Sequence, residues 1–196
     1  ASGSQKGYMI PPGLSFISIS EKAWKANALS NLPKFYLDLE SYKKSLFTNS
    51  NPFTPSVNLM FALDEALKMM KEEGLENIFQ KHERHKKAIS GAAKKLNLKL
   101  FANENSLSPS ITAIEAQNFD AESFRKSIQS KYGIQLAGGQ DHLKGKIFRV
   151  GHLGYINDLD IISVITAIGL ALYEKNIVNQ NDIGEALIEA KKHLES

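Results

Sequence analysis

The sequence predicts an α/β protein, with a small β-sheet that carries helices packed on one face. Two kinds of segment follow one another along the chain. In short segments typical of strands, apolar and polar residues alternate, and in longer segments the apolar residues recur at helical spacing. The connections between these segments are short and rich in turn-forming residues, as expected when successive elements pack together. The 196 residues, 42% of them hydrophobic, suffice for a packed core.

The first part of the chain predicts one strand and three helices. Residues Gly13–Ser20 alternate polar and apolar side chains after two prolines, which exclude a helix there. Ser20 is the expected N-cap of a helix over Glu21–Leu29, and Asp38 caps a short helix that runs through Lys44. Apolar residues at helical spacing predict a further helix from Val57 that ends at Gly74.

The remainder alternates between helices and strands. The predicted helices are 75–96, 121–131, 158–173 and 181–193, and the predicted strands are 98–101, 110–116, 134–136 and 147–150. Asp120 and Asn157 precede two of these helices as N-caps, and Asn179 or Asn181 precedes the last. This second part is expected to form an α+β domain.

Composition narrows the classes of function. The net charge is only +3, and charges of both signs interleave, as over Lys68–Glu73, which argues against nucleic-acid binding. No apolar run is long enough for a membrane span, and the first residues lack the features of a signal peptide. The chain has no cysteine, which excludes disulfides and thiolate metal sites. We therefore expect a cytoplasmic protein that binds neither nucleic acid nor a membrane.

Lys6 is the first candidate for chemistry. It lies among glycines and small polar residues just before a predicted strand, where a flat ligand can approach the backbone. A lysine in such a loop can form a Schiff base if its pKa is lowered by burial or neighbouring charge. Taken alone, however, a lysine near a chain end is most often a solvated surface residue.

Several motifs, in order along nearly the whole chain, resemble one family. The motifs are Gly3-Ser4-Gln5-Lys6, Gly13-Leu14-Ser15-Phe16-Ile17, Pro52-Phe53-Thr54-Pro55, Ala137-Gly138-Gly139-Gln140 and the segment Gly145–Gly154. This pattern is similar to the C-terminal half of class V (fold type I) pyridoxal-phosphate-dependent aminotransferases. Within that family it most resembles the alanine/serine–glyoxylate branch, which includes proteins labelled as the small subunit of a soluble hydrogenase.

The resemblance implies a role for four residues. Lys6 would hold pyridoxal 5'-phosphate as a Schiff base and move the proton between substrate and cofactor. Gln5 would contact the cofactor phosphate, and Thr54 would donate to a phosphate oxygen in the partner's site of a homodimer. Arg149 would bind the substrate carboxylate. The implied reaction moves an amino group between a small amino acid, alanine or serine, and a 2-oxo acid, glyoxylate or pyruvate.

Arg149 is also a candidate on its own chemistry. A planar guanidinium binds a carboxylate through two parallel N–H bonds, and Arg149 ends an apolar strand followed by glycine, where a ligand can reach it. The alternative is a buried ion pair. Arg84 and Arg125 fall on predicted helices with lysine neighbours, and both are interpreted as surface residues.

The histidines do not predict a metal site. His82 and His85 lack the i, i+4 spacing of the metalloprotease helix and have no third ligand nearby in the sequence, so their role is interpreted as structural. His152 is expected to pack or to cap backbone beside the Arg149 strand. The pair Gly138-Gly139 is a common turn signal and is not assigned to the cofactor.

The resemblance also predicts the domain organisation. Residues 1–79 would be the remnant of the large cofactor-binding domain, and 80–196 the small C-terminal domain. The family's aspartate for the pyridinium nitrogen and its phosphate-binding loop belong to an N-terminal half that this sequence does not contain. We therefore expect the chain to be inactive alone and to work with that half in a homodimer.

Two other classes of function stay open. The chain could be a folded regulatory or scaffolding module that keeps the lysine motif without chemistry. The parent could instead be a class V lyase, although the absence of cysteine argues against a desulfurase, which needs a mobile thiol.

Overall fold

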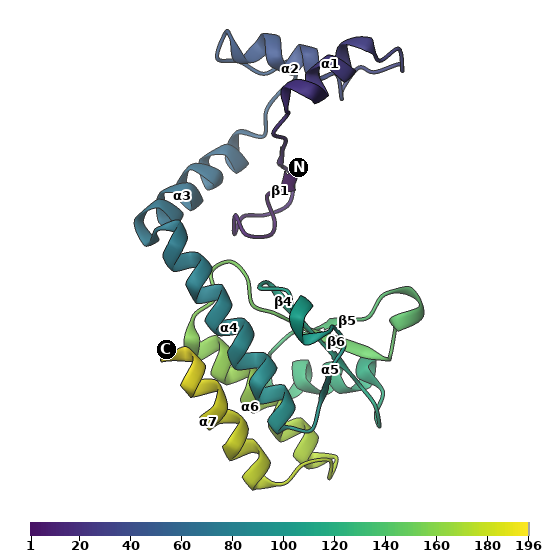
Figure 1. Ribbon diagram of the computed structural model, residues 1–196, viewed down its shortest axis with the longest axis vertical. Helices are drawn as coiled ribbons and strands as arrows, with labels where there is room; N and C mark the ends of the chain where they lie inside the picture. The colour runs from purple at the N-terminus through teal and green to yellow at the C-terminus, as the bar shows by residue number, and fades with distance from the viewer. Residues whose placement is uncertain (196) are drawn as a thin grey trace. The chain divides into compact units, whose positions relative to one another are not determined.

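The computed structural model describes residues 1–195, which form two compact units. The first unit is Ala1–Glu72, and the second begins at Glu73. Figure 1 shows the helices and strands of each unit. Compactness does not reveal the origin of a unit, so the assignment of residues 1–79 and 80–196 to two family domains stays a prediction.

The first unit opens with a two-stranded antiparallel hairpin. Strand β1 (Ser2–Gly3) pairs with β2 (Ser15–Phe16), so that Ser2 faces Phe16 and Gly3 faces Ser15. The predicted strand over 13–20 is thus much shorter than expected. Its partner offers only two residues before the chain turns away, and Gly13 has a φ of 143°, which is not strand geometry.

Three helices follow in the first unit. They are α1 (Glu21–Leu29), α2 (Leu39–Leu46) and α3 (Val57–Glu73), whose last residue opens the second unit. The Ser20 hydroxyl accepts a hydrogen bond from the Ala23 amide at 3.2 Å, and Asp38 accepts one from the Glu40 amide at 3.4 Å. Both predicted caps are therefore confirmed. Each side chain accepts a hydrogen bond from an amide that the start of a helix otherwise leaves without a partner.

The second unit is built on a four-stranded antiparallel sheet. Its strands are β3 (Lys99–Leu100), β4 (Ile111–Glu115), β5 (Ala137–Gly138) and β6 (Ile147–Gly151), in the order β3-β4-β6-β5. The predicted strand over 134–136 is wrong, because the edge strand β5 lies just beyond it. Gly133 ends the preceding helix in a left-handed conformation, and Leu136 is buried without joining the sheet.

Four helices complete the second unit (Figure 1). They are α4 (Leu75–Lys95), α5 (Ala121–Tyr132), α6 (Asp158–Glu174) and α7 (Gln180–Leu194). Helices α4 and α5 pack against the sheet. Helix α6 contacts α4 and α5, and α7 lies along α4 and α6. This mixed architecture of helices on a small sheet confirms the predicted fold class.

The core of the second unit lies between these helices and the sheet. Phe124 of α5 and Phe148 of β6 are fully buried, with ring centroids 5.2 Å apart, and Phe119 packs on both. Aromatic rings at this separation add to the stability gained from burial alone. None of the helices within residues 1–195 has the length and apolar character that crossing a bilayer requires.

Candidate functional site

Lys6 lies in the loop that joins β1 to β2. Its side chain and that of Gln5 are exposed. The Lys6 carbonyl accepts a hydrogen bond from the Met9 amide at 3.0 Å, which makes a tight turn in which Met9 has a φ of 62°. The Ser4 amide donates to the Leu14 carbonyl at 3.1 Å, next to the β1–β2 pairing. The loop therefore presents an accessible amine on a backbone that is held at both ends.

Gln5 lies beside Lys6, and its side chain turns back over Gly3. A Cβ atom added at Gly3 would come within 2.7 Å of Gln5 Oε1. Because Gly3 has no side chain, the Gln5 amide can occupy this space. The structure brings two of the predicted site residues, Gln5 and Lys6, onto the same exposed loop.

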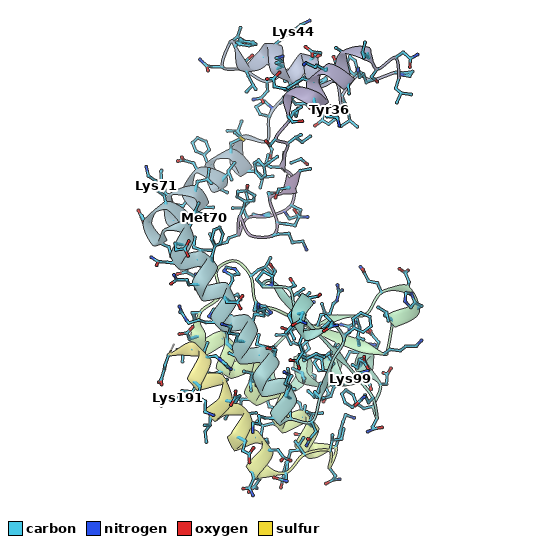
Figure 2. The ribbon with its side chains drawn as sticks, viewed as in Figure 1. Tyr36, Lys44, Met70, Lys71, Lys99 and Lys191 are labelled. Atoms are coloured by element: carbon cyan, nitrogen blue, oxygen red, sulfur yellow. The ribbon has the colours of Figure 1, made fainter. Side chains whose placement is uncertain are left out.

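Thr54 lies on a different loop of the first unit, between α2 and α3, and is exposed. The preceding residue, Phe53, anchors this loop. Its ring centroid is 5.5 Å from that of Phe35, 4.8 Å from Tyr36 and 6.0 Å from Tyr42. Tyr36, labelled in Figure 2, belongs to the segment between α1 and α2. These ring contacts fix the backbone from which the Thr54 hydroxyl projects.

Arg149 lies on β6, in the second unit, between Ala113 of β4 and Ala137 of β5. Its Nε–H donates to the carbonyl of Gly138 at 2.9 Å. That bond fixes the plane of the guanidinium and leaves its two terminal nitrogens for a ligand. Two parallel N–H donors held in this way suit a carboxylate.

An open, polar cleft of about 550 Å³ surrounds Arg149. Its charged lining residues are Glu122, Arg125, Asp141, Lys144 and Arg149. Arg125 Nε and Nη2 donate to the two carboxylate oxygens of Glu122 at 3.0 and 2.6 Å, and this contact holds the pKa of Glu122 below its usual range. Because this pair is internally neutral, Arg149 and Lys144 supply the positive charge of the cleft, opposed by Asp141 alone.

Arg125, interpreted as a surface residue, lines this open cleft and is partly buried. Only 25% of the Arg125 side chain is exposed, and its Nε would lie 3.0 Å from a Cβ added at Gly138. The i, i+3 spacing of Glu122 and Arg125 on a predicted helix was a signal for their ion pair. Their position against the Arg149 strand depends on tertiary contacts that sequence spacing does not encode.

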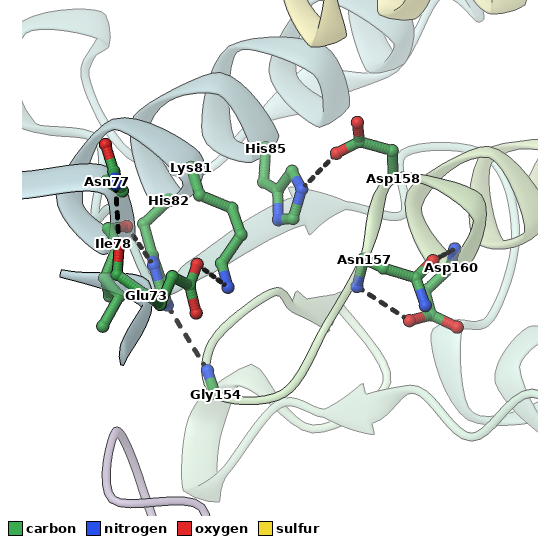
Figure 3. A network of polar contacts seen from close by, with 10 residues as sticks. All are labelled: Glu73, Asn77, Ile78, Lys81, His82, His85, Gly154, Asn157, Asp158 and Asp160. Carbon is green, nitrogen blue, oxygen red and sulfur yellow. Dashed lines mark hydrogen bonds and ion pairs between the residues drawn. The ribbon is translucent and has the colours of Figure 1, made fainter. Parts of the chain in front are cut away.

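A network of polar contacts ties α4 to the segment after β6 (Figure 3). His82 Nδ1 lies 2.7 Å from the Ile78 carbonyl, and His82 Nε2 accepts a hydrogen bond from the Gly154 amide at 3.3 Å. The His82 ring therefore bridges the backbone of α4 and the segment after β6. His85 Nε2 lies 2.8 Å from Asp158 Oδ1 at the start of α6. These partners agree with the structural role that the sequence predicts for both histidines.

His152 is fully buried, with Nε2 2.9 Å from the Thr112 hydroxyl. Burial, reinforced by the neighbouring His85 and His82, lowers the pKa of His152 to about 4. No side chain of residues 1–195 bonds to its Nδ1. The packing role expected for His152 is thus confirmed. Across the same residues, no cluster of three or more histidine, aspartate or glutamate side chains is placed to hold a metal ion.

Comparison with known proteins finds similarity of sequence and fold to aminotransferases. No family model matches the chain. It is 54% identical over 181 residues to the soluble hydrogenase 42 kDa subunit of Anabaena cylindrica, covering 92% of this chain and 47% of that protein. It is 35% identical to the serine–glyoxylate aminotransferase of Methylorubrum extorquens, over 89% of this chain and 45% of the relative.

Solved structures agree with the sequence matches. The crystal structure of ureidoglycine–glyoxylate aminotransferase from Bacillus subtilis superposes with a TM-score of 0.88 and 28% identity, covering 99% of this chain and 51% of that one. The chain therefore spans about half the length of the proteins it matches.

Proposed function

Because this chain belongs to the class V aminotransferases of the alanine/serine–glyoxylate type, as the counterpart of their C-terminal half, we propose that its parent protein is a pyridoxal-phosphate-dependent aminotransferase. The parent moves an amino group between a small amino acid, alanine or serine, and a 2-oxo acid, glyoxylate or pyruvate. The observation that carries the proposal is the similarity of 99% of the chain to a glyoxylate aminotransferase at a TM-score of 0.88.

The residues of the first unit fit the cofactor chemically. The exposed amine of Lys6 suits the cofactor's aldehyde, and the Gln5 amide and the Thr54 hydroxyl are donors for phosphate oxygens. When bound, pyridoxal phosphate supplies an electron-withdrawing ring that stabilises negative charge on the substrate carbon. Lys6 would hold the cofactor through Nζ, and the same amine, once freed, would accept the proton from the substrate's α carbon and return it. Thr54 acts in the partner's site of a homodimer.

Arg149 orients the substrate in this proposal. Its Nε–H is engaged by the Gly138 carbonyl, so the terminal nitrogens bind the carboxylate that amino acid and oxo acid share. The open, polar cleft of about 550 Å³ around it has room for a small substrate whose carboxylate reaches Arg149. Glyoxylate and pyruvate, alanine and serine all fit this description.

Borohydride reduction after incubation with pyridoxal phosphate tests the role of Lys6. Intact mass and peptide mapping of the protein reconstituted with its N-terminal half should give one phosphopyridoxyl adduct, on Lys6. The adduct should be absent in Lys6→Ala and present in Lys22→Ala, a matched change at an exposed lysine of α1. Labelling scattered over surface lysines, or none, would contradict the assignment and favour a non-catalytic module.

Assays with paired substrates separate transfer from elimination. We expect alanine or serine with glyoxylate or pyruvate to give the exchanged amino and oxo acids in equal amounts. Release of ammonia, or of a cleaved side chain without transfer, would instead identify a class V lyase. The 196-residue chain alone is expected to be inactive, because the pyridinium-binding aspartate lies in the other half. The homodimer and the cytoplasmic location stay predictions.

A further inference from the structure

Ser4 is a buried polar residue two positions before Lys6, and its hydroxyl has partners on both sides. The residue is 0% exposed. Ser4 Oγ donates to the Pro11 carbonyl at 2.7 Å and accepts from the Leu14 amide at 3.2 Å. The hydroxyl thus uses its donor and one acceptor position within the loop that carries Lys6.

The Ser4 backbone adds two more bonds to the same segment. Its amide donates to the Leu14 carbonyl at 3.1 Å, and its carbonyl accepts from the Ile10 amide at 3.4 Å. Ile10 is buried as well. Four hydrogen bonds from one residue therefore tie the start of the loop to three residues near its end.

The hydroxyl is needed because this part of the loop is short of backbone donors. Pro11 and Pro12 have no N–H group, so neither can donate a backbone hydrogen bond to close the loop. The Ser4 hydroxyl satisfies the Pro11 carbonyl instead, and it gives the Leu14 amide an acceptor. An alanine at position 4 would leave both groups without their partner in a region that is partly removed from water.

We infer that Ser4 is a positioning residue, whose hydroxyl closes the loop of residues 4–14 and thereby fixes the backbone that carries Lys6. Within the closed loop, the turn from Lys6 to Met9 sets the direction in which the amine projects. The inference rests on the proposed role of Lys6 for its consequence in the enzyme. The closure of the loop itself is independent of that role.

The test compares Ser4→Ala with Ser15→Ala in the protein reconstituted with its N-terminal half. Ser15 lies on β2 of the same hairpin and is exposed, so the control removes a hydroxyl that does not close the loop. Hydrogen–deuterium exchange of the Ile10 and Leu14 amides should accelerate about tenfold or more in Ser4→Ala and stay unchanged in Ser15→Ala. Unchanged exchange in Ser4→Ala would overturn the inference.

A second readout separates positioning from simple structural support. In the protein loaded with pyridoxal phosphate, the pH midpoint of the cofactor's visible absorption should shift in Ser4→Ala and not in Ser15→Ala. Faster exchange without such a shift would overturn the positioning role. If borohydride trapping finds no adduct on Lys6 in the unmodified protein, both the proposed function and the positioning role of Ser4 fail. The hydrogen–deuterium exchange data still decide whether Ser4 closes the loop.

A milder variant covers the case in which Ser4→Ala does not fold. Ser4→Cys keeps the size of the side chain and a weak donor. We expect it to accelerate exchange of the same amides and to shift the same midpoint, each by less than Ser4→Ala. A Ser4→Cys protein that folds and matches Ser15→Ala in both measurements would overturn the inference.

Discussion

Lys6 and Arg149 are held in place by different means. The Lys6 side chain is exposed, and its direction depends on the backbone of a closed loop. The Arg149 side chain is fixed directly, through the bond from Nε to the Gly138 carbonyl. A change near Lys6 should therefore act through the backbone, whereas a change at Arg149 acts on the binding group itself.

Arg149→Lys should weaken substrate binding without disturbing the cofactor. Lysine lacks both the Nε–H that bonds to Gly138 and the paired terminal nitrogens, so it loses the fixed, two-point contact with a carboxylate. In steady-state assays of the reconstituted enzyme, KM for the amino acid should rise about tenfold or more, with the cofactor absorption unchanged. Arg84→Lys, on α4 and outside this cleft, is the control. An unchanged KM in Arg149→Lys would argue against the carboxylate role.

His152 should make the protein less stable in acid. Its pKa is lowered from 6.5 to about 4 in the folded protein, so the fold favours the neutral ring. The stabilisation is complete when the pH is above 6.5, the pKa of His152 in the unfolded protein. It is lost as the pH falls from 6.5 toward about 4, the pKa in the folded protein. The full difference corresponds to about 3 kcal/mol in the free energy of unfolding. Denaturant unfolding followed by circular dichroism, at about pH 7.5 and about pH 4.5, measures most of this difference.

His152→Gln is the informative variant for this pH dependence. Glutamine can still bond to the Thr112 hydroxyl but does not titrate. Its unfolding free energy should fall less between the two pH values than that of the unmodified protein. Part of the loss should remain, because burial also lowers the pKa of His85. Equal losses in both proteins would show that His152 does not contribute.

At the scale of elements, local signals predicted the helices well. Ser20, Asp38, Asp120, Asn157 and Asn179 each accept a hydrogen bond from an amide in the first turn of the helix that follows. Such caps depend on neighbours within a few residues, so the sequence alone reveals them.

The strands and the cleft were predicted less well, because they depend on distant partners. Nothing local distinguishes Ala137–Gly138, the true edge strand, from the more apolar residues before it. Strand β1 likewise exists only because β2 lies beside it. The resemblance assigned Arg149 to the substrate carboxylate, but the position of the Glu122–Arg125 ion pair in the cleft depends on the packing of α5 against β5.

Replacement by alanine should change the unfolding free energy in opposite directions at two glycines of the second unit, Gly139 and Gly184. A Cβ at Gly139 would lie 2.1 Å from the Leu143 carbonyl oxygen, which is backbone and cannot move aside alone. A Cβ at Gly184, inside α7, would meet nothing within 4 Å. Gly184→Ala should therefore raise the unfolding free energy by about 0.5–1 kcal/mol, because alanine favours the helix.

Gly139→Ala should lower the unfolding free energy by about 1–3 kcal/mol, the usual cost of overpacking. The comparison is internally controlled, since both variants add one methyl group to the same unit. Thermal and denaturant unfolding of the two variants measures the difference. A stabilised Gly139→Ala would mean that the loop after β5 relaxes around the added methyl.

At the scale of the whole molecule, the first unit leaves much apolar surface uncovered. Leu29, Phe35 and Phe47 are 87%, 80% and 81% exposed. Single exposed apolar residues are common, but α1, α2 and the segment between them carry several. The relatives that this chain matches are about twice its length.

The chain studied alone should therefore self-associate through its first unit. Exposed apolar groups gain free energy when they leave water, so association should increase with concentration. Sedimentation velocity over a range of concentrations should reveal oligomers or aggregates. Replacing Leu29 and Phe47 together by serine should shift the distribution toward the monomer. Tyr155→Ser, at an exposed aromatic residue of the second unit, should not. A chain that stays monomeric at all concentrations would mean that this surface is compatible with water.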